Sequence, residues 1–158
     1  MGEAGVDILV GSDGNDSLFG GDGDDVLVGI DPAVPAFGFG AGEIDTLTGG
    51  VGSDLFLLGD NGNIEVNNGT RIDIERENPE VYYEGGFNSD YALITDFTGG
   101  EDRIQLRSDQ QFTGYSFGTT SGELPSGIGI SFNNDLIAVV QGVSFFDLFS
   151  SYENFNFV

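Results

Sequence analysis

The chain has 158 residues, with 27 Asp and Glu against 4 Lys and Arg, and therefore a formal net charge of -23. A surface this negative repels a phosphate backbone, which excludes direct binding of nucleic acid. The chain has no Cys and no His, which excludes disulfides, thiolate metal sites and catalysis by imidazole.

The composition also bounds the fold. An acidic excess is typical of disordered tails, but 39% hydrophobic residues, including 14 Phe, indicate a chain that builds a core. No run of 18 apolar residues occurs, so no membrane span is expected. The opening MGEAGVDILVG lacks the basic and apolar segments of a secretory signal peptide.

The N-terminal region repeats every nine residues. Each repeat has an aspartate, a large apolar residue two positions later, and a glycine five positions earlier. The aspartates are Asp7, Asp16, Asp25, Asp45 and Asp54; the apolar residues are Leu9, Leu18, Leu27, Leu47 and Phe56; the glycines are Gly2, Gly11, Gly20, Gly40 and Gly49.

Two segments, GGDGDDVLV (20–28) and GGVGSDLFL (49–57), match the pattern G-G-x-G-x-D-x-U-x at every defined position. This pattern resembles the RTX (hemolysin-type) calcium-binding nonapeptide repeat family, over residues 2–57. YALITDFTGGEDRIQL and DLIAVVQGVS also resemble segments that follow such repeats in secreted bacterial proteins of the cyanobacterial type. The resemblance implies an all-β fold, a right-handed parallel β-roll in which each nonapeptide forms half a coil.

The resemblance also implies the ligands. Calcium takes about six to eight oxygen ligands in flexible geometry, which suits carbonyl groups mixed with carboxylates. In the family each ion lies between turns of successive coils on one side of the roll, and the pairing rule gives roughly three to five ions here. The implied ligands in the repeats are Asp7, Gly11, Asp13, Asp16, Gly20, Asp22, Asp25, Gly29, Asp45, Gly49 and Asp54.

Alternatives to this interpretation differ in how well they fit. An EF-hand needs Glu at position twelve and flanking helices, but counting from Asp13 reaches Asp24, and the flanks SLF and VLV indicate strands. Disordered turns remain the alternative. Two irregularities interrupt the pattern. Glu43 stands where a glycine is expected, and it either adds a ligand or distorts the turn. The extra residues, at about positions 30–40, are predicted to form a bulged insertion.

The strands predict two different sheets. Odd and even repeats should alternate between opposite sheets, with the eighth residue of each repeat pointing inward. The outward pairs of the odd repeats are aliphatic, and those of the even repeats are mostly polar. One sheet should therefore be covered, most simply by the C-terminal hundred residues, and the other exposed to water. The odd pairs are Ile8/Val10, Val26/Val28 and Leu55/Leu57; the even pairs are Ser17/Phe19 and Thr46/Thr48.

Residues 58–158 are predicted to form a β-rich flanking or capping region. GGFNSDYAL (85–93) looks like a degenerate repeat with Asp90 in the sixth place, while Asp96 and Asp102 form either a closing calcium site, as the resemblance implies, or turn caps. YALITDF, DRIQL, GIGISF and DLIAVVQGV indicate strands, and FFDLFSSY one short helix. The ending YENFNFV is interpreted either as a type I secretion signal or as an edge strand.

Three functions are weighed. The first is a calcium-dependent folding and secretion module of a larger exported protein, extracellular or at the cell surface, with calcium ions and type I secretion machinery as partners. The second is a module that binds polysaccharide or a cell-surface layer through calcium, with Tyr82 and Tyr83 either stacking on sugars or packing against the roll. The third, an enzyme, is not expected, because the repeat carboxylates are committed to metal and no His or Cys is available.

Overall fold

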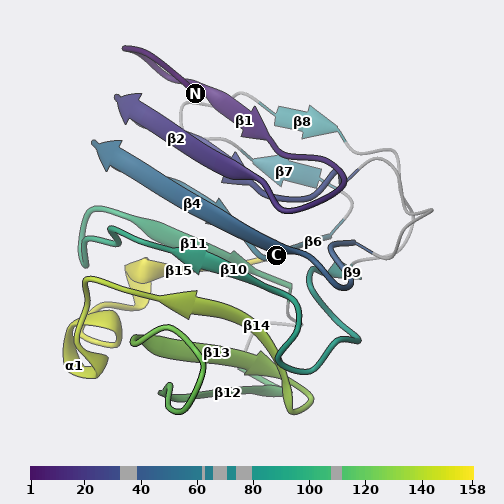
Figure 1. Ribbon diagram of the computed structural model, residues 1–158. Helices are drawn as coiled ribbons and strands as arrows, with labels where there is room; N and C mark the ends of the chain where they lie inside the picture. Colours follow the sequence, from purple (N-terminus) through teal and green to yellow (C-terminus); the bar gives the residue numbers. More distant parts are fainter. Residues whose placement is uncertain (33–38, 62, 66–70, 74–79, 108–111) are drawn as a thin grey trace.

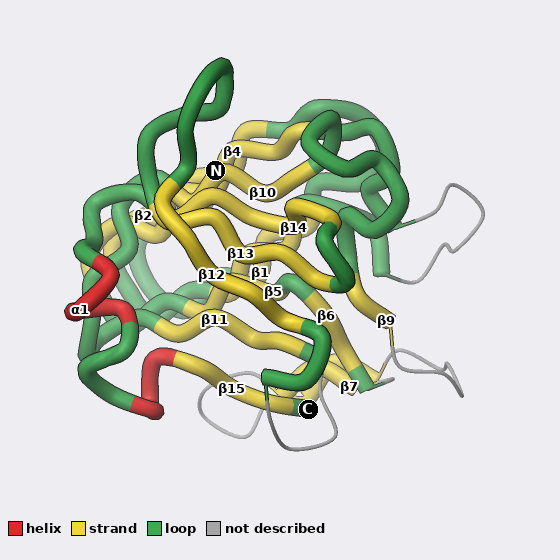
Figure 2. The backbone as a smooth tube through the Cα atoms, turned by 90° about the horizontal axis from the view of Figure 1, so that it is seen from below, coloured by secondary structure: helices red, strands yellow, loops and turns green. Residues whose placement is uncertain are grey.

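The regular secondary structure of the described residues consists almost entirely of strands (Figures 1 and 2). A computed structural model describes residues 1–32, 39–61, 63–65, 71–73, 80–107 and 112–158. Most of the strands belong to two sheets, and the helical elements of the described residues are confined to two short segments near the C-terminus. These are α1 (Phe145–Leu148) and the 3-10 helix η2 (Tyr152–Asn154).

The first sheet has five parallel strands in the order β1-β3-β5-β11-β15. Its first three strands come from the odd nonapeptides, and the other two come from beyond residue 57. The strands are β1 (Ile8–Val10), β3 (Val26–Val28), β5 (Leu55–Leu57), β11 (Arg103–Leu106) and β15 (Phe155–Phe157).

The second sheet has six strands in the order β12-β13-β14-β10-β4-β2, and it is mixed. Neighbouring strands are parallel from β2 to β14, whereas β13 is antiparallel to both β14 and β12. The strands are β2 (Ser17–Asp22), β4 (Ile44–Val51), β10 (Tyr91–Ile94), β12 (Tyr115–Thr119), β13 (Ile128–Phe132) and β14 (Asp135–Val140).

Successive repeats alternate between these two sheets, as the nine-residue period predicts. The alternation between the sheets continues after the predicted insertion, because β4 pairs with β2 and places Leu47 beside Leu18. Residues 33–38 of that insertion lie outside the described residues. The predicted inward residues are all buried, from 0% exposed at Leu27, Leu47 and Phe56 to 8% at Leu9 and 9% at Leu18. Both sheets contain strands from either side of residue 57.

The outer faces of the sheets differ as predicted, except at the N-terminal edge. The outward aliphatic pairs of β3 and β5 are buried, whereas Ile8 and Val10 of β1 are 41% and 44% exposed. On the other sheet, Ser17 is exposed and Phe19 is 43% exposed, while Thr46 and Thr48 are half-buried. The aliphatic face is therefore covered over β3 and β5, and the polar face is open to solvent.

The C-terminal segments form the predicted elements. All four predicted strands are present as β10, β11, β13 and β14, and the predicted short helix is α1, whose N-cap Ser144 accepts a hydrogen bond of 3.1 Å from Asp147 N. The ending forms β15 at the edge of the five-stranded sheet, which confirms an edge strand. Beside it lies a cluster of aromatic rings, with centroids 4.7–6.2 Å apart, made of Phe112, Phe117, Phe149, Phe155 and Phe157.

Two small antiparallel sheets complete the described strands. One pairs β6 (Gly59–Asp60) with β9 (Glu80–Val81), and the other pairs β7 (Asn63–Glu65) with β8 (Arg71–Asp73). The prediction of an all-β chain is therefore confirmed. A single parallel β-roll does not account for the whole chain, because one large sheet is mixed and these two sheets are separate.

Candidate metal centre

A ladder of aspartates runs along the entry to the five-stranded sheet. Each member precedes a strand, and each member after Asp7 accepts a hydrogen bond from the backbone N–H of the corresponding Asp one coil earlier. Asp7 N donates to Asp25 Oδ1 at 2.8 Å, Asp25 N to Asp54 Oδ1 at 2.9 Å, and Asp54 N to Asp102 Oδ1 at 2.9 Å. One carboxylate oxygen of each acceptor thus ties successive coils together.

A second, shorter ladder lies at the entry to the six-stranded sheet. Asp16 N donates to Asp45 Oδ1 at 2.7 Å. Glu43, the residue that breaks the glycine pattern, accepts from Gly14 N through Oε1 at 2.8 Å. The Glu43 side chain thus joins two turns in the same way as the aspartates do.

The glycines at the first repeat position bring carbonyl oxygens up to these carboxylates. A Cβ on Gly11 would lie 2.7 Å from Asp16 Oδ2 and in collision with the carbonyl oxygen of Gly29. A Cβ on Gly20 would likewise collide with Asp25 Oδ2 and the carbonyl oxygen of Gly49. Only glycine leaves room for this convergence of a carboxylate oxygen and a carbonyl oxygen from the neighbouring coil.

Three repeat aspartates have a second oxygen that is buried and makes no hydrogen bond: Asp16 Oδ2, Asp25 Oδ2 and Asp54 Oδ2. Burial of a charged oxygen without a partner is costly, and it raises the pKa of Asp25 and brings that of Asp54 to about 6. The charges of neighbouring aspartates add to the rise at both. These oxygens fit a hard cation as their missing partner.

Asp45 is different, and the difference lies in a residue that the sequence did not suggest. Its Oδ2 accepts a 2.5 Å hydrogen bond from the hydroxyl of Tyr83. Burial raises the pKa of Asp45, and the Tyr83 hydrogen bond partly offsets the rise. Tyr83 is 0% exposed, and its hydroxyl lies beside Gly29 at the place that a carbonyl oxygen of the neighbouring coil takes beside Gly11 and Gly20.

The same observation corrects the idea of an aromatic sugar platform. Tyr82 and Tyr83 are both fully buried, and Tyr82 donates a 2.6 Å hydrogen bond to Asp60 Oδ2. Their rings cannot stack on a ligand because they pack into the protein core. The packing interpretation of these tyrosines is confirmed, and the stacking interpretation is wrong.

The predicted candidates beyond the repeats occupy three positions. Asp96 accepts from Gly49 N at 3.0 Å and Gly50 N at 2.9 Å, and Asp102 accepts from Thr98 N at 2.7 Å in addition to its ladder bond. Asp90 directly precedes β10, but Tyr91 pairs with Ile44, so Asp90 lies beside Glu43, two positions before Asp45. Asp90 therefore continues the edge of the sheet out of register with the ladder.

The remaining candidates lie around the ladders: Gly20 and Asp22 are in β2 and Gly49 is in β4, whereas Gly11, Asp13 and Gly29 are outside the strands. The side chains of Asp13 and Asp22 are exposed, whereas Gly20, Gly29 and Gly49 are buried and Gly11 is half-buried. Among the described residues, no three acidic side chains gather around one point. Any cation at the ladders would therefore draw most of its oxygens from backbone carbonyls, as the convergence at Gly11 and Gly20 allows.

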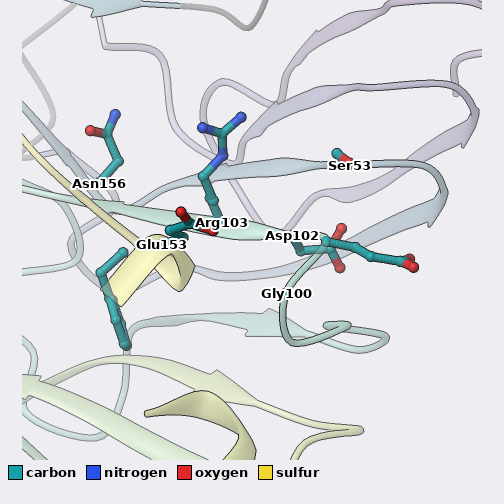
Figure 3. Close-up of a pocket in the computed structure, with 8 residues that line it drawn as sticks. Ser53, Gly100, Asp102, Arg103, Glu153 and Asn156 are labelled. Carbon is teal, nitrogen blue, oxygen red and sulfur yellow. The ribbon is translucent and has the colours of Figure 1, made fainter. Parts of the chain in front are cut away.

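A cleft of about 330 Å³ lies at the end of the first ladder (Figure 3). Ser53, Asp102, Arg103, Glu153 and Asn156 are among its lining residues. Close by, Gly100 N donates to Asn154 Oδ1 at 2.8 Å. The only hydroxyl among these five residues is Ser53, and the chain has no His to activate it. The cleft therefore offers no Ser–His pair.

Comparison with known proteins supports the metal interpretation at one end of the chain. Residues 1–29 match the family model of the RTX calcium-binding nonapeptide repeat (4 copies). No curated protein matches the chain. Within the described residues, no helix has the length and hydropathy needed to cross a membrane. The matched family is a calcium-binding repeat and not a catalytic domain, and the match covers residues 1–29 of the 158 in the chain.

Proposed function

We propose that the chain is a calcium-dependent folding module of a larger exported protein. The observation that carries the proposal is the set of buried oxygens without partners at Asp16, Asp25 and Asp54. A carbonyl oxygen from the adjacent coil converges on the first two of them. Calcium is the cation suited to such a mixture of carboxylate and carbonyl oxygens.

The electrostatics favour folding only when cations are present. The chain carries a formal net charge of -23, and compaction brings carboxylates together while it also removes some of them from water. At Asp25 and Asp54 the ladder hydrogen bond uses one carboxylate oxygen, which leaves the other oxygen buried and without a partner. Because the site does not exist in the unfolded chain, the free energy of metal binding becomes free energy of folding.

The proposed architecture is a β-roll. The parallel pairs among β1, β3 and β5 and between β2 and β4 support it, and its right-handedness follows from the RTX resemblance. On this proposal β10, β11, β14 and β15 extend the same two sheets as a flanking region over residues 58–158. The sites would hold roughly three to five ions between successive turns on the same side.

The proposed setting is outside the cell. Calcium sites of extracellular modules typically bind with Kd of about 10⁻⁴–10⁻³ M, far weaker than the sites of cytosolic sensors. A chain with sites of that kind stays unfolded until it is exported, which suits passage through type I secretion machinery. Stacking of sugar rings on Tyr82 and Tyr83 is not part of the proposal, because both side chains are buried.

The proposal is tested by far-UV circular dichroism during a calcium titration, with magnesium and monovalent salt as controls. We expect a cooperative gain of β signal with calcium alone. Asp25→Asn should shift the titration midpoint to higher calcium, while Glu123→Gln, which removes the same charge from an exposed side chain, should not. An equal gain with magnesium or salt would show that charge screening suffices, and a fully folded chain in chelator would refute the folding switch.

A further inference from the structure

Two buried carboxylates, Asp90 and Asp135, lie at the start of the neighbouring strands β10 and β14. These strands are parallel neighbours, with Ala92 beside Ala138. Asp90 directly precedes β10, and Asp135 is the first residue of β14. The two side chains therefore lie at the same end of adjacent strands.

The local sequence explains how Asp135 reaches this place. Asn133 and Asn134 connect β13 to β14, and both have positive φ, 50° and 72°. Two successive left-handed residues are typical of a type I′ hairpin turn, which asparagine tolerates better than most residues. This tight turn places Asp135 against the loop that leads into Asp90.

Backbone groups of that loop and of the turn before β4 hold the two carboxylates. Gly85 N donates a short hydrogen bond to Asp135 Oδ2, and Leu136 N donates to the carbonyl oxygen of Phe87 at 2.9 Å. Asp90 Oδ2 accepts from Gly42 N at 2.9 Å. A Cβ on Gly86 would collide with the Asp90 carboxylate, so the loop is in close contact with this side chain.

The other oxygen of each carboxylate is without a partner. Asp90 is 0% and Asp135 8% exposed, and Oδ1 of both is buried with no hydrogen bond. The consecutive residues Gly85 and Gly86 contact Asp135 and Asp90 respectively, so the two carboxylates lie close together. Burial raises the pKa of Asp90, and the charge of Asp135 also raises it. Such a pair needs either a cation or a shared proton to be stable.

We propose that Asp90 and Asp135 together bind one divalent cation at the start of β10 and β14. Calcium fits best, because two carboxylates leave positions that backbone carbonyls and water can fill. From the nine-residue period alone, Asp90 would be assigned to a degenerate nonapeptide. In the proposed site its partner is instead Asp135, which lies 45 positions later in a segment without repeats. This inference does not depend on the proposed folding role.

Native mass spectrometry of the full chain, at the calcium concentration that just saturates it, counts the bound ions. We expect one ion fewer in Asp90→Asn, in Asp135→Asn and in the double variant, and no loss in the matched control Glu123→Gln. An unchanged count in the Asp variants would assign the pair to a shared proton, and two ions lost in the double variant would assign the residues to separate sites. Either result overturns the proposal.

A measurement on the unmodified chain covers the case in which a variant fails to fold. The carboxyl ¹³C resonances of Asp90 and Asp135 should shift together during the last equivalent of calcium, and calcium-insensitive resonances would refute the site. Failure of the proposed folding role has a separate signature, because the chain would then be folded in chelator whatever number of ions it binds.

Discussion

The spacing of the coils makes a sharp prediction for two glycines at the same repeat position. Gly14 and Gly23 both occupy the fourth place of a nonapeptide, and both have positive φ, 96° and 137°. A Cβ on Gly14 would meet nothing within 4 Å, whereas one on Gly23 would overlap the carbonyl group of Gly5, whose carbon would be 2.6 Å away. Both positions need a backbone conformation with positive φ, but only Gly23 has another coil packed against it.

The expected costs follow from these two terms. Alanine at positive φ costs about 1–2 kcal/mol, which is the whole expected effect of Gly14→Ala. Gly23→Ala adds an overlap with a backbone group that cannot rotate away, comparable to overpacking a core at about 1–3 kcal/mol more. The sum for Gly23→Ala is therefore about 2–5 kcal/mol.

Urea denaturation at saturating calcium, followed by far-UV circular dichroism, compares the free energies of unfolding of the two variants. Gly23→Ala should be the less stable by at least about 1 kcal/mol, the low end of the overlap term. Equal losses in both variants would mean that backbone strain alone decides, and that the coils are not packed as closely as the structure has them. A larger loss in Gly14→Ala would refute the reasoning outright.

Two further predictions concern the buried carboxylates. Tyr83→Phe leaves Asp45 Oδ2 without its hydrogen bond and should lower the free energy of unfolding in chelator-free buffer by about 1–3 kcal/mol; an unchanged denaturation midpoint would contradict the assigned bond. The pKa of Asp54 is about 6 in the fold, against 3.8 for the ordinary group. Without metal, the folded chain therefore binds this proton more tightly than the unfolded chain does. The resulting contribution to stability is present below pH 3.8 and is lost as the pH rises through 6. Calcium binds the ionised carboxylate, so calcium affinity should weaken as the pH falls through 6, and calcium binding should release protons. Calorimetry in buffers of different ionisation enthalpy measures that proton release. Binding without proton release at pH 5.5 would count against Asp54 as a ligand.

The alternation of the strands was accessible from the sequence because it rests on a strict period. Each nonapeptide carries its own turn glycines and its own inward apolar residue, so strand positions and the parity of the two sheets follow without knowledge of distant contacts. The burial of Leu27 and Leu47 at 0% exposure is the outcome of that local code.

The features that the sequence did not predict depend on contacts between distant residues. Tyr83 lies 38 positions from Asp45 in the chain and outside the repeats, and nothing in its local sequence marks it as a hydrogen-bond donor to a ladder aspartate. Asp135 follows an ordinary Asn-Asn turn, and only the parallel pairing of β10 with β14 brings it close to Asp90. The two-position offset of Asp90 from the ladder is likewise a matter of register between strands, which the nine-residue phase alone did not fix.

The ladder aspartates perform two tasks with one side chain, and this explains why an amide is a poor replacement for them. One oxygen accepts a backbone N–H from the neighbouring coil, a task that asparagine could perform equally well. The other oxygen of Asp25 and Asp54 has no protein partner, so its negative charge has value only when a cation is bound. A chain that needed its aspartates solely as links between coils would gain stability from asparagine at these positions. The presence of aspartate at every repeat therefore favours a fold whose stability is set by the supply of cations.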